Sequence, residues 1–163
     1  MKKNLLFLLM AVFALSFTAC SDDDDDDKTV AEKLAGTYTG TIDIYSVNES
    51  GEQGTPLGET LENQKIYMTA QGEYNLQLEL KDFKFTAITI PSIKVNTKVS
   101  ADGKNTISGK AEGIVVMTGI TATAEVSGSI VDNKADLNIN VEAPLVPSAE
   151  PMKMLVKFNG TKK

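Results

Sequence analysis

Apolar and polar residues alternate through most of the chain after residue 36. Between residues 37 and 44, the even positions hold tyrosine, glycine and two isoleucines, and the odd positions hold three threonines and an aspartate. A period of two is typical of a β-strand that buries one face. The pattern predicts about eight to ten strands and an all-β domain. The alternation recurs in residues 66–70, 74–81, 93–99, 107–111, 122–130, 137–141 and 154–158.

Turn-forming residues separate several of these stretches. Gln71-Gly72, Asp102-Gly103 and Asp132-Asn133 each fall where a hairpin needs a tight reversal. Glycine, asparagine and aspartate tolerate the backbone angles of such turns. We therefore expect consecutive strands to form antiparallel hairpins. The helical signal is confined to residues 29–34, where a threonine and a glutamate have capping-box spacing.

Strands with one apolar face must bury those faces against one another. An antiparallel meander that closes into a barrel does this and also removes exposed strand edges. A two-sheet β-sandwich is the alternative.

The start of the chain has the organisation of a secretion signal. Two lysines precede an apolar run, and small residues precede Cys20, the one cysteine of the chain. The run of about 13 residues is shorter than a membrane-spanning helix requires. The ending Phe17-Thr18-Ala19-Cys20 resembles a lipobox, in which the cysteine thiol receives a diacylglyceryl group. The resemblance implies a lipoprotein signal peptide at residues 1–19 and a lipid anchor on Cys20. Cleavage after Ser16 is the alternative.

An acidic segment follows the predicted lipid anchor. Ser21 precedes six consecutive aspartates, and like charges at this density repel one another. We expect residues 20–32 to form a disordered tether. The order cysteine, serine, polyaspartate resembles the surface-export signal of Bacteroidetes lipoproteins, which implies an outer-membrane, cell-surface location. A plain spacer, on the periplasmic face, is the alternative. The export signal would consist of Ser21, Asp22, Asp23 and Asp24.

The tether holds most of the net charge. Without residues 1–19 the chain has 14 lysines and 22 acidic residues, a net charge of −8, and without the six aspartates the net charge is −2. The remaining domain is nearly neutral. The chain also has no arginine, the side chain that best recognises phosphates and base edges. Nucleic acid is therefore not an expected partner.

Most catalytic and metal-binding chemistry is absent from the composition. The chain has no histidine, which excludes histidine bases and imidazole ligands. A lipidated Cys20 is neither a nucleophile nor a disulfide partner. The acids of the domain alternate with apolar residues on polar strand faces or lie in loops, which is unlike a pair converging across a cleft. We expect no enzyme, no metal site and no cofactor.

Four segments resemble the calycin-like β-barrel domains of Bacteroidetes lipoproteins, over roughly residues 33–161. They are residues 34–41, 73–76, 126–129 and 156–160. The resemblance implies a single calycin-like, lipocalin-like barrel domain at residues 33–163. Gly36-Thr37-Tyr38 keeps the spacing of the glycine-x-tryptophan motif of lipocalins, but the chain has no tryptophan. No particular lipocalin ligand therefore transfers to it.

The predicted inward face combines very small and very large residues. Small residues recur at 109, 111, 113, 122, 124 and 128. They either balance the large residues in a filled barrel or leave room for a ligand. Residues 48–63 are long for a hairpin connection and could lie over a barrel mouth, and the proline-rich residues 143–151 form a lid, a contact surface or a segment folded onto the core. The possible pocket-lining residues are Tyr38, Tyr74, Phe83, Phe85, Met68 and Phe158.

These observations favour a noncatalytic, membrane-anchored lipoprotein that binds a small apolar ligand or a glycan through its barrel. A filled interior, without a concave site of about 300 Å³, would argue against an internal ligand. The alternative is a structural or accessory surface protein that docks a protein partner.

Overall fold

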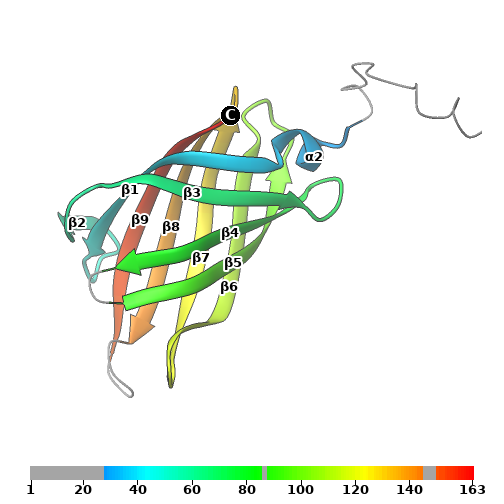
Figure 1. Cartoon of the computed structure of the whole chain (residues 1–163). Coiled ribbons are helices and arrows are strands. Elements are labelled where there is room, and N and C mark those ends of the chain that lie inside the picture. Colours follow the sequence, from blue (N-terminus) through cyan, green and yellow to red (C-terminus); the bar gives the residue numbers. More distant parts are fainter. Residues whose placement is uncertain (1–27, 86–87, 145–149) are drawn as a thin grey trace, which may run out of the picture.

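A computed structural model describes residues 28–85, 88–144 and 150–163 (Figure 1). The predicted signal peptide, Cys20 and the predicted export residues Ser21 to Asp24 lie outside these ranges. One short helix and nine strands make up the described part. They are α2 (Val30–Leu34), β1 (Gly36–Val47), β2 (Gln53–Pro56), β3 (Leu61–Ala70), β4 (Asn75–Phe85), β5 (Ile88–Ser100), β6 (Thr106–Met117), β7 (Ile120–Val131), β8 (Lys134–Pro144) and β9 (Pro151–Lys162).

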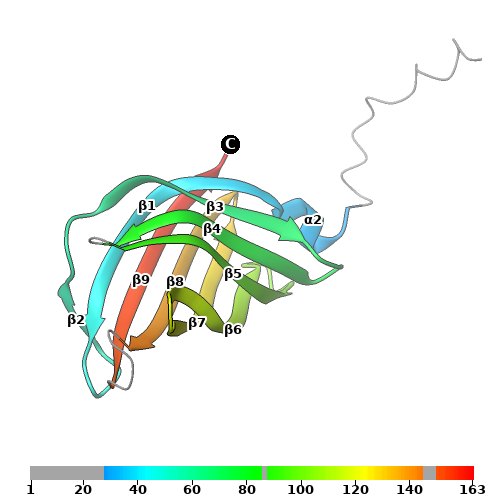
Figure 2. The ribbon, with the colours of Figure 1, turned by 60° about the horizontal axis from the view of Figure 1, so that its bottom comes forward.

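The strands form one antiparallel sheet that closes on itself. The order is β2-β1-β3-β4-β5-β6-β7-β8-β9, and β1 also pairs with β9. Eight strands therefore make a closed barrel, and β2 is an extra strand beside β1 (Figures 1 and 2). The prediction of a closed meander is confirmed, and the sandwich alternative is wrong. Closure lets every strand turn its apolar face to the shared interior.

The predicted turns connect the expected strands. Asp132 and Asn133 have φ angles of 48° and 62° and join β7 to β8 in a two-residue hairpin. Positive φ at both positions is the requirement of a type I′ turn, which matches the twist of antiparallel strands. Gln71-Gly72 and Asp102-Gly103 lie in the β3–β4 and β5–β6 connections. Local turn chemistry therefore fixes these three hairpins.

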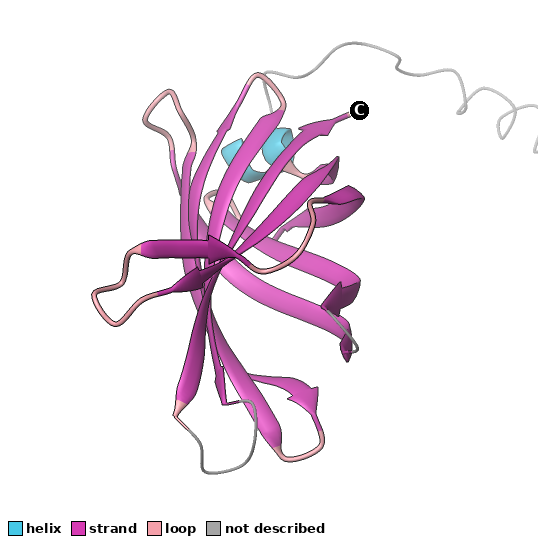
Figure 3. Cartoon of the chain, turned by 90° about the vertical axis from the view of Figure 1, so that its left-hand side faces the viewer, coloured by secondary structure: helices cyan, strands magenta, loops and turns pink. Residues whose placement is uncertain are grey.

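Helix α2 covers one end of the barrel, as Figure 3 shows. The predicted capping box is confirmed: Glu32 N donates to Thr29 Oγ1 over 3.2 Å, and Thr29 N donates to Glu32 Oε2 over 2.8 Å. Ala31 is completely buried, and its backbone N donates to the Glu73 carbonyl oxygen over 3.0 Å. The folded unit therefore begins at or before Thr29, ahead of the expected boundary at residue 33.

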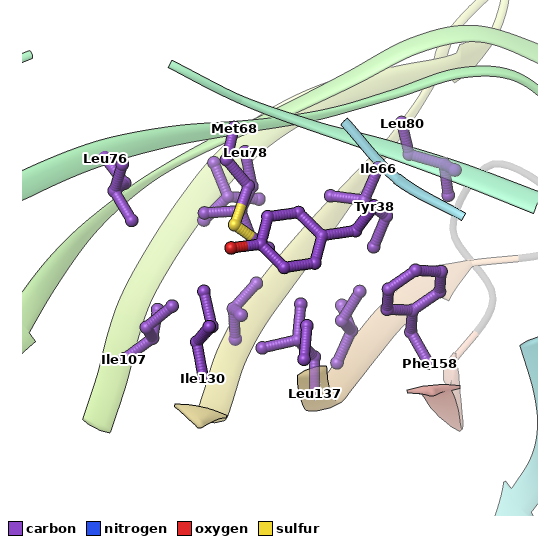
Figure 4. Packing of buried hydrophobic residues seen from close by; sticks show 14 of the residues in the cluster. Tyr38, Ile66, Met68, Leu76, Leu78, Leu80, Ile107, Ile130, Leu137 and Phe158 are labelled. Carbon is purple, nitrogen blue, oxygen red and sulfur yellow. The ribbon is translucent and has the colours of Figure 1, made fainter. Parts of the chain in front are cut away.

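The interior beneath α2 is tightly packed. Tyr38, Leu76, Ile107, Leu137 and Phe158 are completely buried and face one another there (Figure 4). Tyr38 Oη donates a hydrogen bond to the Leu34 carbonyl oxygen over 2.9 Å, which satisfies the last turn of the helix. Burial raises the pKa of Tyr38 to about 12. The side chain of Tyr38 in β1 thus contacts both helix α2 and the core.

We expect Tyr38→Phe to lower the free energy of unfolding by about 1–2 kcal/mol at pH 8, because the buried Leu34 carbonyl loses its donor. Urea unfolding measures the change. The matched control is Tyr74→Phe, since Tyr74 is 43% exposed, and its effect should stay within about 0.5 kcal/mol.

The cost of Tyr38→Phe should shrink above pH 10. Folding raises the pKa of Tyr38 from its ordinary 10.0 to about 12, so the unfolded chain ionises first as the pH rises. The free energy of unfolding of the wild-type protein therefore falls above pH 10. The phenylalanine variant has no hydroxyl at this position and does not lose this free energy. A cost that stays constant or grows between pH 8 and pH 10.5 would contradict the burial of this hydroxyl.

Candidate functional site: an apolar cavity at the open end of the barrel

In the described part of the chain, no helix covers the end of the barrel opposite α2. The β3–β4, β5–β6 and β7–β8 turns lie at the helix end, since Ala31 in α2 bonds to Glu73 in the first of them. Turns alternate between ends in an antiparallel meander. The last residues of β4, β6 and β8 and the first residues of β5, β7 and β9 therefore lie at the other end, which we call the open end (Figure 1).

The barrel separates between β5 and β6 toward the open end. These strands pair only from Thr97↔Gly109 to Ser100↔Thr106. Beyond that point residues 88–96 pair with β4, and residues 110–117 pair with β7. The described ends of the β4–β5 pair and of the β6–β7 pair accordingly lie apart in Figures 1 and 2.

A cavity of about 160 Å³ occupies the interior at this end. Its wall comes from most of the barrel strands, and every described side chain in it is apolar. Groups of this kind offer contact to hydrocarbon and no hydrogen bond. The wall includes Ile44, Ile66, Leu78, Leu80, Phe83, Ile90, Ile93, Val95, Ile114, Val116, Met117, Ile120, Ala122, Ala124, Val126, Ile139, Val141, Ala143, Pro144, Met154 and Val156.

The cavity is small for a ligand site. Sites for drug-sized molecules usually have about 300–1,000 Å³, whereas an apolar cavity of about 150 Å³ stays dry and holds one benzene. The cavity volume of about 160 Å³ is below the roughly 300 Å³ that we expected for a site enclosing a whole ligand. It accommodates one ring or a short stretch of chain, with the remainder outside the mouth.

Two backbone irregularities turn side chains into this cavity. Leu80 and Phe83 are both buried although they are three residues apart, because Asp82 between them has a φ of 50°. Asp82 lies opposite Pro91 in β5, since Phe83 pairs with Ile90 and Lys81 with Ser92. The alternation therefore changes phase on both strands, and Phe83 and Ile90 reach the cavity wall.

A bulge has the same effect in β6. Gly113 has a φ of 70° and is exposed, and the register shifts between Ala111↔Ala124 and Ile114↔Ala122. The expectation that Gly113 lies on the buried face is wrong, because the bulge turns it outward and turns Ile114 inward.

The small inward residues serve two purposes. Ala122 and Ala124 line the cavity. Gly109 and Gly128 instead permit close approach of the neighbouring strand, because a Cβ atom would lie 2.3 Å from the Asn96 carbonyl oxygen or 2.1 Å from that of Asp136. The role of Gly109 and Gly128 was in neither alternative from the sequence, and room for a ligand beside Ala122 and Ala124 stays a prediction.

The six predicted pocket residues lie in different places. Phe83 lines the cavity. Tyr38, Met68 and Phe158 are buried in the core but lie outside the cavity wall. Tyr74 precedes β4 and is 43% exposed, so it does not line the cavity. The side chain of Phe85 lies outside the described part. Most of the cavity wall consists of aliphatic side chains such as Ile90 and Ile114, which the sequence analysis did not select. Pro91 and Gly113 were the sequence features that could have indicated a break in the alternation next to them.

Residues 48–63 lie along β1. They contain β2, which pairs Pro56 with Tyr45, and Leu57 N donates to the Ile44 carbonyl oxygen over 2.7 Å. No residue of this segment is part of the cavity wall, and the expectation that it lies over the mouth stays a prediction. Of the proline-rich segment, Ala143 and Pro144 line the cavity, and residues 145–149 lie outside the described ranges.

The described acidic residues with shifted pKa values make surface contacts. A hydrogen bond from Ser92 Oγ, 2.9 Å long, lowers the pKa of Glu79, and Lys81 and Lys94 lie within 3.6 Å of the same carboxylate. A hydrogen bond from Thr106 similarly lowers the pKa of Asp102. In residues 28–85, 88–144 and 150–163, no three acidic, histidine or cysteine side chains cluster as metal ligands would. No helix in these ranges has the length and hydropathy to span a membrane.

We expect Ala124→Leu to change the free energy of unfolding by less than about 1 kcal/mol, because its added carbons enter the cavity. Ala135→Leu is the matched control: Ala135 is 2% exposed and lies in the core outside the cavity wall. Overpacking there should cost about 1–3 kcal/mol. Equal losses in urea unfolding would show that no usable space exists beside Ala124.

A solved structure shares this fold. A Bacteroides fragilis protein, described provisionally as an outer membrane protein, aligns with a TM-score of 0.56 at 17% identity, over 78% of this chain and 50% of that chain. An auxiliary nutrient binding protein from Bacteroides thetaiotaomicron aligns with a TM-score of 0.37 at 10% identity, over 78% of this chain and 45% of that chain. The chain thus spans half or less of the length of these two proteins.

Sequence comparison gives a family. Among proteins with curated descriptions, none matches the chain. The model of the calycin-like beta-barrel domain matches residues 34–161, which include all nine strands except the last residue of β9. The chain therefore belongs to the calycin-like β-barrel domain family.

Proposed function

We propose that this chain is a noncatalytic lipoprotein, anchored in the outer membrane through Cys20, that binds an apolar group in the cavity at the open end of its barrel. The observation that supports this most is the cavity wall, in which every described side chain is apolar. None of the described acidic, basic or nucleophilic side chains is part of the cavity wall. The site therefore suits binding of an apolar group without chemical change.

The lining favours hydrocarbon over sugar. A glycan hydroxyl that enters without a hydrogen-bond partner loses several kcal/mol of hydration, about 2–7 in model transfers. The one buried polar side chain of the described core, Thr97, already donates to the Leu76 carbonyl oxygen over 3.1 Å. A glycan would find polar groups on the outer face instead, such as Asp136 and Asn159 in an open hollow over β8 and β9.

The cavity volume sets the expected affinity. Burial contributes about 0.8 kcal/mol per methylene, so a chain of five or six carbons gains about 4–5 kcal/mol before association costs. A Kd near 1 mM corresponds to about 4 kcal/mol. An isolated short chain should therefore bind weakly, and a natural ligand gains further affinity outside the mouth.

The proposed anchor also gives the domain an orientation. The segment from Cys20 reaches the barrel at α2, which covers the end opposite the mouth. On this proposal the mouth points away from the membrane, and Ser21 to Asp24 direct export to the cell surface. The provisional description of the B. fragilis protein as an outer membrane protein accords with that location.

A protein-docking role is the second candidate. Val115 is 63% exposed and Met117 is 41% exposed, and both lie in the part of β6 that borders the cavity. Apolar side chains at the rim of an apolar site are typical of contact surfaces.

Straight-chain alcohols test the binding proposal. We expect 1-butanol, 1-hexanol and 1-octanol to perturb the methyl resonances of Ile90 and Ile114 in NMR titrations. Affinity should rise about fourfold per added methylene, the equivalent of about 0.8 kcal/mol. Ala124→Leu should weaken binding at least tenfold by filling the cavity.

The matched control is Thr123→Leu, which adds a leucine on the outer face of the same strand and should leave the titration unchanged. Shifts that are absent, or that spread over the outer surface and are insensitive to Ala124→Leu, would refute internal binding.

The anchor is tested in the full precursor. Cys20→Ala should abolish labelling with radioactive fatty acid and release the protein from the membrane fraction, because the thiol that accepts the lipid is lost. Replacement of Asp22, Asp23 and Asp24 by alanine is the matched variant, which should keep the lipid but lose protease accessibility on intact cells. Continued lipid labelling of Cys20→Ala would overturn the assignment.

A further inference from the structure

The end of β6 has a free edge beside the cavity. Residues 114–117 pair with β7 through Ile114↔Ala122, Val115↔Thr121 and Met117↔Ile120. Pairing between β5 and β6 ends at Gly109, so no described strand bonds to the other edge of residues 114–117. Backbone N–H and C=O groups on such an edge can pair with an added strand.

This edge lacks charge and proline, two of the usual protections against pairing. Natural edge strands are blocked by charges, proline or bulges. In β6 the charges stop at the Lys110–Glu112 ion pair, 2.7 Å long, and the register of the pairing with β7 shifts at the Gly113 bulge and again between Val115 and Met117. Residues 114–117 are isoleucine, two valines and methionine. Across the opening, β5 has Pro91 without an N–H group, and the exposed Lys94. The β6 edge is therefore the better acceptor.

We propose that residues 114–117 accept one extended segment of a partner protein as an additional antiparallel or parallel strand, whose alternate apolar side chains enter the cavity beside Ile114 and Val116. Side chains alternate along a strand, so one face of the segment would reach the cavity and the other would cover the exposed Val115. The segment should be extended, apolar at every second position and uncharged over about four residues.

The topology favours a single segment over a second copy of this chain. A second copy could present the same edge only as part of its β6–β7 hairpin, so its β7 would also have to enter the opening between β5 and β6. A lone extended segment brings no neighbouring strand. The inference goes beyond capture of a small apolar molecule, because recognition here depends on the backbone.

A fluorescent peptide provides the test. It has three alternating threonine–valine pairs between terminal lysines, and its binding to the whole domain is followed by anisotropy. The comparison peptide has the same sequence with N-methyl groups on the threonine and valine amides, which keeps the apolar side chains but removes the backbone donors. We expect the N-methylated peptide to bind at least tenfold more weakly.

Protein variants locate the site. Val115→Lys places a charge on the outer side of the edge and should weaken peptide binding about threefold or more. Val131→Lys is the matched control, because Val131 is 40% exposed at the other end of β7, and it should have no effect. The alcohol titration should remain unchanged in Val115→Lys, since this side chain points away from the cavity.

Three results would overturn the strand proposal. Equal binding of both peptides would mean that side chains are captured without backbone pairing. Binding of alcohols with no binding of either peptide would leave the apolar cavity as a small-molecule site alone. Sedimentation showing a dimer that Val115→Lys dissociates would assign the edge to a second copy of the chain.

Discussion

Strand β1 closes the barrel, because it pairs with β3 along one edge and with β9 along the other. The pairing with β9 runs from Tyr38↔Lys162 to Ser46↔Met154 and places Gly40 opposite Gly160. A Cβ atom at Gly40 would lie 1.9 Å from the Asn159 carbonyl oxygen, so the closure depends on glycine at this position. Without the closure between β1 and β9, the apolar faces of the eight strands would have no common interior.

The two ends of that interior differ because only one of them is covered. At the helix end, α2 adds Ala31 and Leu34 to the core, and the Tyr38 hydroxyl satisfies the Leu34 carbonyl oxygen. Lys162 Nζ also donates to the carbonyl oxygens of Lys33 and Ala35 over 2.7 and 3.0 Å. At the open end, β5 and β6 separate and leave a cavity of about 160 Å³. The filled part of the interior therefore lies beneath the helix, and the apolar cavity lies at the other end.

A small hydrophobic ligand and an inserted peptide strand would use the same apolar wall in different ways. A small ligand needs only the volume beside residues such as Ala122 and Ala124. A strand needs in addition the unpaired edge of residues 114–117, which gives recognition through the backbone. Val115 at the rim is 63% exposed, and an added strand on this edge would cover it.

The sequence by itself determined the all-β class, the hairpin turns and the capped helix, because each depends on residues close together in the chain. Alternation placed Tyr38 and Phe158 inside, and Thr29 with Glu32 began the helix. Only the tertiary structure decided which buried residues line the cavity. Phe83 and Ile114 reach it because Asp82 and Gly113 shift the alternation, and such a shift depends on the paired strand. The separation of β5 from β6 depends on the whole sheet, so no local pattern predicts it.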